Sequence, residues 1–257
     1  MREFCELVET MRRLRGPGGC PWDQEQSHET LKPYLLEESY EALEAVDSGD
    51  PAKLCAELGD VLLQVVFHAQ IAEENDRFDI AAVCKRINDK LIYRHPHVFS
   101  DVQVSGSDQV VDNWEQLKRR EKEAATRDSA LDGIPVALPA LMHATDVQKK
   151  AARVGFDWAD IQGPLEKIDE ELGELQRARA GGDREQVIHE LGDLLFAVVN
   201  VARFLKIDAE DALRMACRRF DARFRQMEEQ AAARGTSLRE MTLEQMDGLW
   251  EDAKEST

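Results

Sequence analysis

The chain has 257 residues, 43% of them hydrophobic and 6% aromatic, with 51 acidic and 33 basic residues and a net charge of −18. This length allows two ordinary domains that fold without disulfides or a structural metal. The charge argues against nucleic acid or an anionic membrane as a partner, because both would be repelled. A polyanionic substrate would need a cation to mediate its contact with the protein.

The N-terminal segment and the cysteines predict a cytoplasmic protein. Residues 1–15 are charged and amphipathic, without the apolar core of a signal peptide. No apolar run approaches the ~18 residues of a membrane-spanning helix. The five cysteines are scattered and form no Cys-x-x-Cys pair, so we expect reduced thiols rather than disulfides or a zinc site.

In chain order, the amphipathic N-terminus is followed by the glycine-rich segment 15–20, which we expect to form a turn. It lacks the Gly-Lys-Ser/Thr ending of a phosphate-binding P-loop. Two helices follow, joined by Ser48-Gly49-Asp50-Pro51, which supplies a glycine stop and then a helix-starting aspartate. This connection predicts an antiparallel pair. His95 and His97 flank Pro96 and indicate a structural loop rather than a metal site.

The second helix of this pair carries one apolar stripe with helical spacing, which we expect to be buried: Leu58, Val61, Leu62, Val65, Val66 and Ala69. Strict alternation typical of strands is missing. Residues 121–139 then form a charged stretch that runs into Pro135 and Pro139, which cannot continue a helix. We therefore place a domain boundary here, with modules at 1–128 and 129–257.

The second module repeats the first. Residues 35–69 align without a gap on residues 168–202, at a constant offset of 133 positions (168 − 35). The apolar stripe recurs at this offset, and Gly181-Gly182-Asp183 repeats the helix-joining turn. Because a long-period repeat is typical of a duplicated unit, the sequence predicts an all-α protein made of two tandem helical modules.

Four carboxylates in each module share one seam. Glu38 and Glu41 are three residues apart on the first helix, as are Glu57 and Asp60 on the second, so each pair occupies one helical face. Antiparallel packing brings all four together, where their repulsion requires neutralisation by protons or cations. The repeat supplies the same set in the second module: Glu171, Glu174, Glu190 and Asp193. Hard oxygen ligands predict Mg²⁺ or Mn²⁺.

The pattern Glu-Glu-x-x-Glu, then 15 residues, then Glu-x-x-Asp resembles the signature of the MazG nucleotide pyrophosphohydrolases, within the all-α nucleoside triphosphate (NTP) pyrophosphatase group. Further segments resemble the two-module members of that family: GCPWD at 19–23, LKPY at 31–34, RHPHVF at 94–99, GFDW at 155–158 and RFDARF at 219–224. The resemblance covers nearly the whole chain.

The resemblance implies a homodimer of helical-bundle modules that hydrolyses NTPs to the nucleoside monophosphate (NMP) and pyrophosphate, with magnesium held by the second carboxylate set and by the first if that module binds metal. Attack by water needs a base, and Glu170 beside the ligands is the candidate; it is equally well read as an ordinary surface residue. The candidate substrate-binding residues are Lys150, Asn200, Arg203, Phe204, Arg219, Arg223, Trp250 and Lys254. The aromatic residues among them are expected either to stack on a base or to pack in the core.

We expect catalysis in the second module, because Phe67 in the first replaces the polar Asn200 of the second. The first module is then expected to serve dimerisation or regulation. A broad NTP and dNTP range in nucleotide-pool housekeeping follows from the resemblance. Two alternatives stay open: a narrower dUTP- or dCTP-type pyrophosphatase, since base selectivity depends on pocket shape, and a non-catalytic nucleotide-sensing scaffold.

Overall fold

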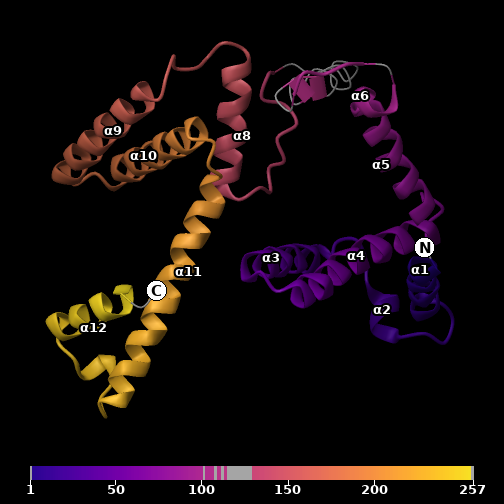
Figure 1. Cartoon of the computed structure of the whole chain (residues 1–257), viewed down its shortest axis with the longest axis horizontal. Coiled ribbons are helices and arrows are strands. Elements are labelled where there is room, and N and C mark those ends of the chain that lie inside the picture. The colour runs from indigo at the N-terminus through magenta and orange to yellow at the C-terminus, as the bar shows by residue number, and fades with distance from the viewer. Residues whose placement is uncertain (1, 101, 107–108, 111–112, 115–128, 256–257) are drawn as a thin grey trace. The chain divides into compact units, whose positions relative to one another are not determined.

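This structure, a computed structural model, describes residues 2–100, 102–106, 109–110, 113–114 and 129–255 (Figure 1). The described residues form helices joined by turns and loops, with no strand among them, which confirms the all-α prediction. The chain divides into two compact units, Met1–Ala124 and Ala125–Thr257. The boundary predicted at residues 128 and 129 falls at the edge of a segment that lies outside the described residues.

The described helices of unit 1 are α1 (Arg2–Arg15), α2 (Pro21–Glu25), α3 (Lys32–Ser48), α4 (Pro51–Glu74), α5 (Ile80–Arg94) and α6 (Pro96–Phe99). Those of unit 2 are α8 (Ala140–Arg153), α9 (Gln162–Gly181), α10 (Arg184–Phe204), α11 (Ala209–Ala233), the 3₁₀ turn η1 (Leu238–Glu240) and α12 (Leu243–Glu255). In each unit the repeated residues form the central pair, α3 with α4 and α9 with α10.

The turns of the two helix pairs are built as the sequence predicts. Gly49 and Gly182 end the first helix of each pair with φ of 67° and 76°, a left-handed conformation that favours glycine. Asp50 and Asp183 then cap the second helix, because each carboxylate accepts hydrogen bonds from the backbone N–H groups two and three residues further on. Local sequence therefore fixes the antiparallel pairing.

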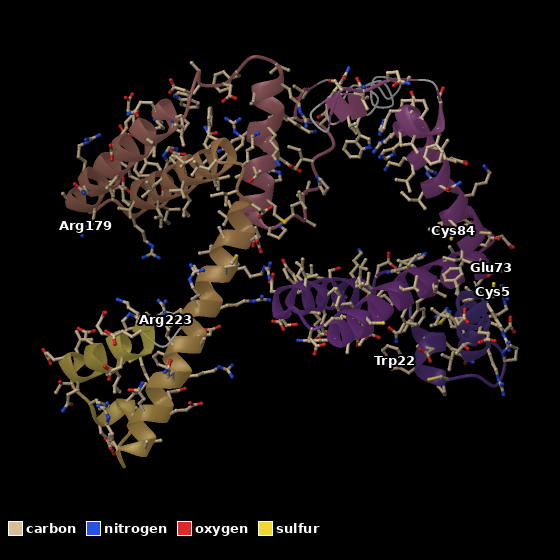
Figure 2. The ribbon with its side chains drawn as sticks, viewed as in Figure 1. Cys5, Trp22, Glu73, Cys84, Arg179 and Arg223 are labelled. Carbon is tan, nitrogen blue, oxygen red and sulfur yellow. The ribbon has the colours of Figure 1, made fainter. Side chains whose placement is uncertain are left out.

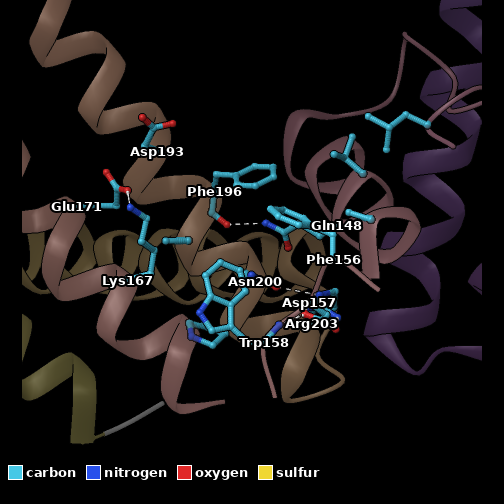
Figure 3. A pocket seen from close by; sticks show the side chains of 15 residues that line it. Gln148, Phe156, Asp157, Trp158, Lys167, Glu171, Asp193, Phe196, Asn200 and Arg203 are labelled. Carbon is cyan, nitrogen blue, oxygen red and sulfur yellow. Dashed lines mark hydrogen bonds and ion pairs between the residues drawn. The ribbon is translucent and has the colours of Figure 1, made fainter. Parts of the chain in front are cut away.

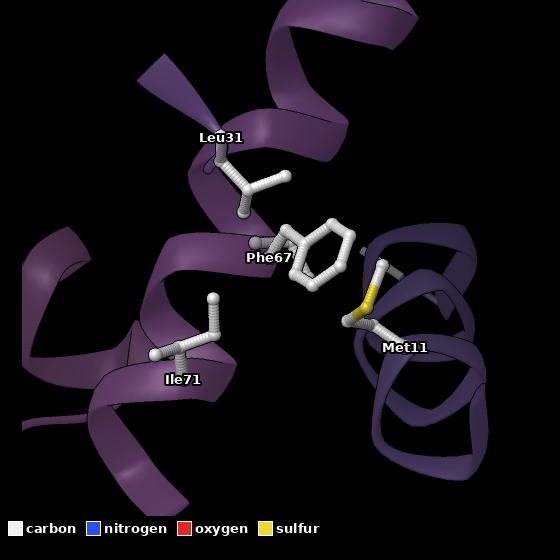
Figure 4. Close-up of a cluster of buried hydrophobic side chains, with 5 residues drawn as sticks. Met11, Leu31, Phe67 and Ile71 are labelled. Atoms are coloured by element: carbon white, nitrogen blue, oxygen red, sulfur yellow. The ribbon is translucent and has the colours of Figure 1, made fainter. Parts of the chain in front are cut away.

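A buried cluster in unit 1 joins α1 to α4. Met11 on α1 faces Phe67 on α4, and Leu31, Val66 and Ile71 complete the cluster (Figure 4). Phe67 is only 3% exposed. Because a buried aromatic ring supplies a large part of a small core, Phe67 is a structural residue of this unit.

In unit 2, α8 packs against α10 and α11, while α12 folds back along α11, away from the α9–α10 pair (Figure 1). A separate apolar cluster holds this second contact, with Met227 and Ala231 from α11 against Leu249 and Ala253 from α12. Unit 2 therefore has two packing regions, one at the N-terminal end of α11 and one at its C-terminal end (Figure 1). The carboxylates lie on the α9–α10 pair.

The apolar stripes are only partly buried. The prediction of a fully buried stripe is therefore wrong for half of the residues in each one. Val66 and Val199 are 1% exposed, but Leu58, Leu62 and Val65 remain 37–53% exposed in unit 1. Their counterparts at the offset of 133, Leu191, Leu195 and Val198, are 46–51% exposed. The physical reason is that a helix buries only the face that meets a neighbour, and the helices packed on α4 and α10 do not cover this face.

Helix α4 also differs from the expectation that no apolar run is long enough to cross a membrane. It contains an 18-residue window with a mean hydropathy of 1.3, which meets the length and composition of a membrane span. The core helix of a soluble protein meets the same condition, and α4 packs against α1 and α3. The five cysteines are free thiols, of which Figure 2 labels Cys5 and Cys84.

Candidate metal and nucleotide site

Three carboxylates of unit 2 converge across the α9–α10 seam. Glu171 and Glu174 lie one turn apart on α9, and Glu190 faces them from α10, with one oxygen of each within 4.8 Å of the others. Glu171 and Glu190 are buried and Glu174 is partly buried. This arrangement follows from the three-residue spacing on α9 and from the turn at Gly182.

Asp193 belongs to a second, overlapping group with Glu190 and His189. The Nδ1 atom of His189 lies 3.1 Å from a carboxylate oxygen of Asp193, and Glu190 is common to both groups. Sequence reasoning missed His189. Its position four residues before Asp193 on one helix was the available signal.

Lys167 is a second residue that sequence reasoning missed. Its Nζ lies 2.6 Å from Oε1 of Glu171 and 3.0 Å from Oε1 of Glu170, and these hydrogen bonds raise the pKa of Lys167. The other oxygen of Glu171, Oε2, is buried without a hydrogen-bond partner among the described residues. A buried carboxylate oxygen with no partner is costly, so this position suits a cation.

Glu170, the candidate base, does not join the carboxylate groups. Its side chain is 56% exposed, and among the described residues it forms an ion pair with Lys167. Glu170 thus stays accessible to solvent water while remaining next to Glu171.

A cavity of about 420 Å³ opens beside the carboxylates (Figure 3). Glu171, Asp193 and Lys167 lie at one side of it, and its remaining walls are mainly apolar. The rings of Phe156, Trp158 and Phe196 contribute to that lining. A volume in the range of roughly 300–1,000 Å³ with apolar walls and a few polar groups is typical of small-molecule sites.

Two of the predicted substrate-binding residues line this cavity. Asn200 is 6% exposed, and its Oδ1 accepts a hydrogen bond of 2.9 Å from Nε of Arg203. The guanidinium of Arg203 also donates to both carboxylate oxygens of Asp157, at 2.5 and 3.0 Å. These hydrogen bonds hold the pKa of Asp157 below its ordinary value. The cavity wall is thus fixed by a charged pair.

Trp158 takes its place because residue 163 is glycine. A Cβ atom at Gly163 would lie 1.6 Å from Cδ1 of Trp158, so no other residue fits without moving the ring. Gly163 precedes Pro164, a buried residue of the first turn of α9 that also lines the cavity. One small residue at the start of α9 therefore positions an aromatic wall.

The other predicted substrate-binding residues lie outside this cavity lining. Lys150 donates to the backbone carbonyls of Leu131 and Asp132, and Phe204 packs under Arg203 with 4.5 Å from the guanidinium carbon to the ring centroid. The remaining four lie on α11 and α12: Arg219, Arg223, Trp250 and Lys254.

On α11 and α12, Trp250 contacts Phe220 with ring centroids 5.1 Å apart, and Arg223 lies 5.9 Å from the Trp250 ring, in the region labelled in Figure 2. Lys254 pairs with Glu251 at 2.6 Å. Since α12 folds away from the α9–α10 pair, the structure does not bring these side chains to the carboxylates of the same chain (Figure 1).

The corresponding site of unit 1 is less complete. Glu38, Glu57 and Asp60 approach one another within 4.8 Å, while Glu41 is exposed and is not part of that group. Partial burial raises the pKa of Glu38, and the nearby Asp60 and Glu41 raise it further. The position of Asn200 is taken by Phe67, which fills the core between α1 and α4.

The fold and the site define a class of protein: a duplicated all-helical protein with acidic oxygen ligands beside an apolar cavity. The MazG nucleotide pyrophosphohydrolase domain matches this chain twice, at residues 26–99 and 162–227. The chain therefore belongs to the MazG nucleotide pyrophosphohydrolase family.

Relatives of known name align with this chain over nearly its whole length. A nucleoside triphosphate pyrophosphohydrolase/pyrophosphatase MazG of Thermotoga maritima is 49% identical over 251 residues, 98% of this chain and 95% of that protein. A nucleoside triphosphate pyrophosphohydrolase of Escherichia coli K12 is 46% identical over 257 residues, 99% and 98% of the two chains. An uncharacterized protein, YabN, of Bacillus subtilis is 49% identical over 255 residues, but these are only 52% of its length.

Proposed function

We propose that this nucleoside triphosphate pyrophosphohydrolase acts through unit 2, cleaving an NTP with water to NMP and pyrophosphate in the presence of Mg²⁺. Mn²⁺ is the expected substitute. The observation that carries the proposal is the convergence of Glu171, Glu174 and Glu190 within 4.8 Å, next to a cavity of about 420 Å³. Asp193 lies in a separate group with Glu190 and His189, and we propose it as the fourth ligand.

The donor set fits a hard divalent cation. All four groups are carboxylates, and the unpartnered Oε2 of Glu171 is a buried acceptor that a cation would satisfy. When bound, such an ion neutralises the phosphate oxygens and the charge that develops on the leaving pyrophosphate. The protein supplies the fixed positions of the ligands, because α9 and α10 are rigid helices joined by a tight turn.

The reaction needs a water aligned opposite the leaving pyrophosphate. Glu170 is our candidate to orient that water and accept its proton, since it is exposed and adjacent to Glu171. The new P–O bond forms at the α-phosphorus, and the bond to the β-phosphate's bridging oxygen breaks. In the free enzyme Lys167 is paired with both Glu170 and Glu171, and release of Glu170 from Lys167 frees the base.

A homodimer would supply the cationic groups that the single chain leaves away from the site. The exposed half-stripe of Leu191, Leu195 and Val198 is an apolar surface on α10, and Leu58, Leu62 and Val65 repeat it on α4. Exposed apolar patches of this kind are typical of subunit interfaces. A second copy seated there would bring its own α11 and α12, with their substrate-binding arginines, lysine and tryptophan.

Unit 1 is proposed to act in dimerisation or regulation, with a second metal site at Glu38, Glu57 and Asp60. Its buried Phe67 leaves no polar group where unit 2 has Asn200. We further propose a broad NTP and dNTP range in nucleotide-pool housekeeping, in the cytoplasm. The net charge of −18 continues to argue against nucleic acid and anionic membranes as partners.

The test is product analysis with the full-length protein, Mg²⁺ and a panel of NTPs and dNTPs. Wild type is expected to release NMP and pyrophosphate, whereas Glu171→Ala and Asp193→Ala lose turnover by more than about 1,000-fold, since the lost metal contacts are worth several kcal/mol. The matched changes Glu38→Ala and Asp60→Ala are expected to retain it. Unchanged turnover in the unit 2 variants would move catalysis to unit 1, and NDP with phosphate as products would refute the reaction.

A further inference from the structure

Gln148 on α8 is a buried amide whose hydrogen bonding is only half satisfied. The residue is 6% exposed and lines the cavity beside the carboxylates. Its Nε2 donates a 2.8 Å hydrogen bond to the backbone carbonyl of Phe196 on α10 (Figure 3). Its Oε1 is buried and has no hydrogen-bond partner among the described residues.

The contact with Phe196 fixes which end of the amide faces which way. A carbonyl oxygen only accepts, so the NH₂ group of Gln148 must face Phe196 and the Oε1 atom must face away from it. The Oε1 atom of Gln148 is therefore available as an acceptor to the rest of its surroundings. An acceptor kept buried and unpaired is costly unless something supplies a donor.

The surroundings of Gln148 indicate what that donor belongs to. Phe156, Trp158 and Phe196 place aromatic rings around the same cavity, which suits a flat heterocycle. Glu171 and Asp193 lie at the other side, where a polyphosphate and its cation would sit. Among the described residues, Asn200 adds an amide whose Oδ1 is engaged by Arg203, so its NH₂ is the remaining group.

We propose that Gln148 is a specificity-determining residue whose Oε1 accepts a hydrogen bond from an N–H of the substrate's nucleobase, either an exocyclic amino group or a ring imino group. This inference rests on the proposed function, because it places the base in the cavity next to the unit 2 carboxylates. All common nucleobases carry at least one such N–H, so this contact is compatible with a broad range. A base with no N–H leaves Oε1 unpaired in the complex, and a site built around a hydrogen bond rejects such an analogue.

The sharpest test changes the substrate and leaves the protein intact. ATP is compared with purine riboside triphosphate, and CTP with pyrimidin-2-one riboside triphosphate; each analogue lacks every base N–H and keeps the ring and the triphosphate. The wild-type kcat/KM is expected to fall roughly 10- to 100-fold for each analogue, the cost of one buried unpaired acceptor. Equal kcat/KM for ATP and CTP and their analogues would overturn the role of Gln148, including the case in which a buried water satisfies Oε1.

Gln148→Met then assigns the effect to this residue, because methionine has a similar length and no acceptor of comparable strength. The variant is expected to lose kcat/KM for ATP by a similar factor and to show little further loss with the analogue. An undiminished preference for ATP over the analogue in a folded Gln148→Met protein would contradict the proposal. Gln186→Met on α10, an exposed glutamine, is the matched control and is expected to behave as wild type.

Failure of the proposed function and failure of the role of Gln148 give different results. If no NTP yields NMP and pyrophosphate with wild type and Mg²⁺, the proposed function fails. If NTPs and the analogues are cleaved equally well, the proposed function stands and only the role of Gln148 fails.

Discussion

The Arg203 guanidinium donates two hydrogen bonds to the Asp157 carboxylate, with N–O distances of 2.5 and 3.0 Å. Arg203 lies in the last turn of α10, and Asp157 lies in the loop between α8 and α9, so the pair connects that loop to the helix that carries Asp193. The Arg203 side chain is 13% exposed and the Asp157 side chain is 27% exposed. The loop that presents Trp158 to the cavity is thus anchored by charge.

This pair makes stability depend on pH in a defined direction. The pKa of Asp157 is lowered by its hydrogen bonds with Arg203, so the carboxylate stabilises the folded state above its unfolded pKa, and that contribution is lost as pH falls through the lowered folded pKa. Asp157→Asn is expected to cost about 1–2 kcal/mol at neutral pH and progressively less in acid. Urea unfolding of wild type and Asp157→Asn from neutral to acid pH measures this difference in unfolding free energy.

The control for this experiment is Asp221→Asn, an exposed acid on α11, which is expected to leave the unfolding free energy within about 0.5 kcal/mol of wild type. A difference between wild type and Asp157→Asn that stays constant down to the lowest pH would contradict the assignment.

Phe67 is predicted to be a core residue of unit 1 rather than part of a site. Phe67→Ala should cost about 3–5 kcal/mol, because it removes a buried ring from the contact between α1 and α4. Phe78→Ala is the matched comparison, since that ring is 46% exposed, and it should cost below about 1 kcal/mol. Equal losses of unfolding free energy in chemical denaturation would show that Phe67 is not the core residue described.

Gly163 is predicted to be essential for the position of Trp158. In Gly163→Ala the new methyl group overlaps the indole, so the ring must move, at a cost of about 1–3 kcal/mol. Tryptophan fluorescence should shift, and the shift should vanish when the same change is made in a Trp158→Phe background. Gly181→Ala, where a Cβ meets nothing within 4 Å, should leave the spectrum unchanged. A shift that persists without Trp158 would locate the disturbance elsewhere.

Lys167 is predicted to act as the counter-ion of Glu171 when no metal is bound. Lys167→Met leaves the buried carboxylate without its partner and should lower the stability of the metal-free protein by about 1–3 kcal/mol. Added Mg²⁺ should restore the loss, so the metal-induced rise in Tm should be larger in the variant than in wild type. Lys149→Met, an exposed change on α8, should show the wild-type rise. An equal or smaller rise in Lys167→Met would argue against competition between lysine and metal.

Local sequence predicts the helix pairs and the grouping of their acids. Gly182 ends α9 and Asp183 caps α10 through contacts with residues close to them in the sequence, so both effects can be predicted from the local sequence. The three-residue spacing of Glu171 and Glu174 places them on a common helical face. Once the turn makes the pair antiparallel, Glu190 must lie near them. The roles of these acids as ligands, and of Glu170 as a base, remain predictions.

The cavity could not be predicted in the same way. Gln148 lines the cavity because α8 packs on α10, and its contact with Phe196 joins residues 48 apart, which no local pattern encodes. Trp158 and Gly163 are close in the sequence, but no motif indicates how the loop before α9 places the ring on the glycine. The prediction that the whole apolar stripe is buried was wrong for a related reason. Periodicity shows that one face of α10 is apolar, but whether Leu191 is buried depends on which helix covers it.

We expect the unit 2 carboxylates to hold the divalent cation against the polyphosphate. Anomalous diffraction from crystals grown with Mn²⁺ and a non-hydrolysable α,β-methylene NTP tests it directly. We expect an anomalous peak at about 2.0–2.3 Å from carboxylate oxygens of Glu171 and Glu190, with the triphosphate beside it. A peak found only among Glu38, Glu57 and Asp60, or a triphosphate bound away from both carboxylate groups, would contradict the account.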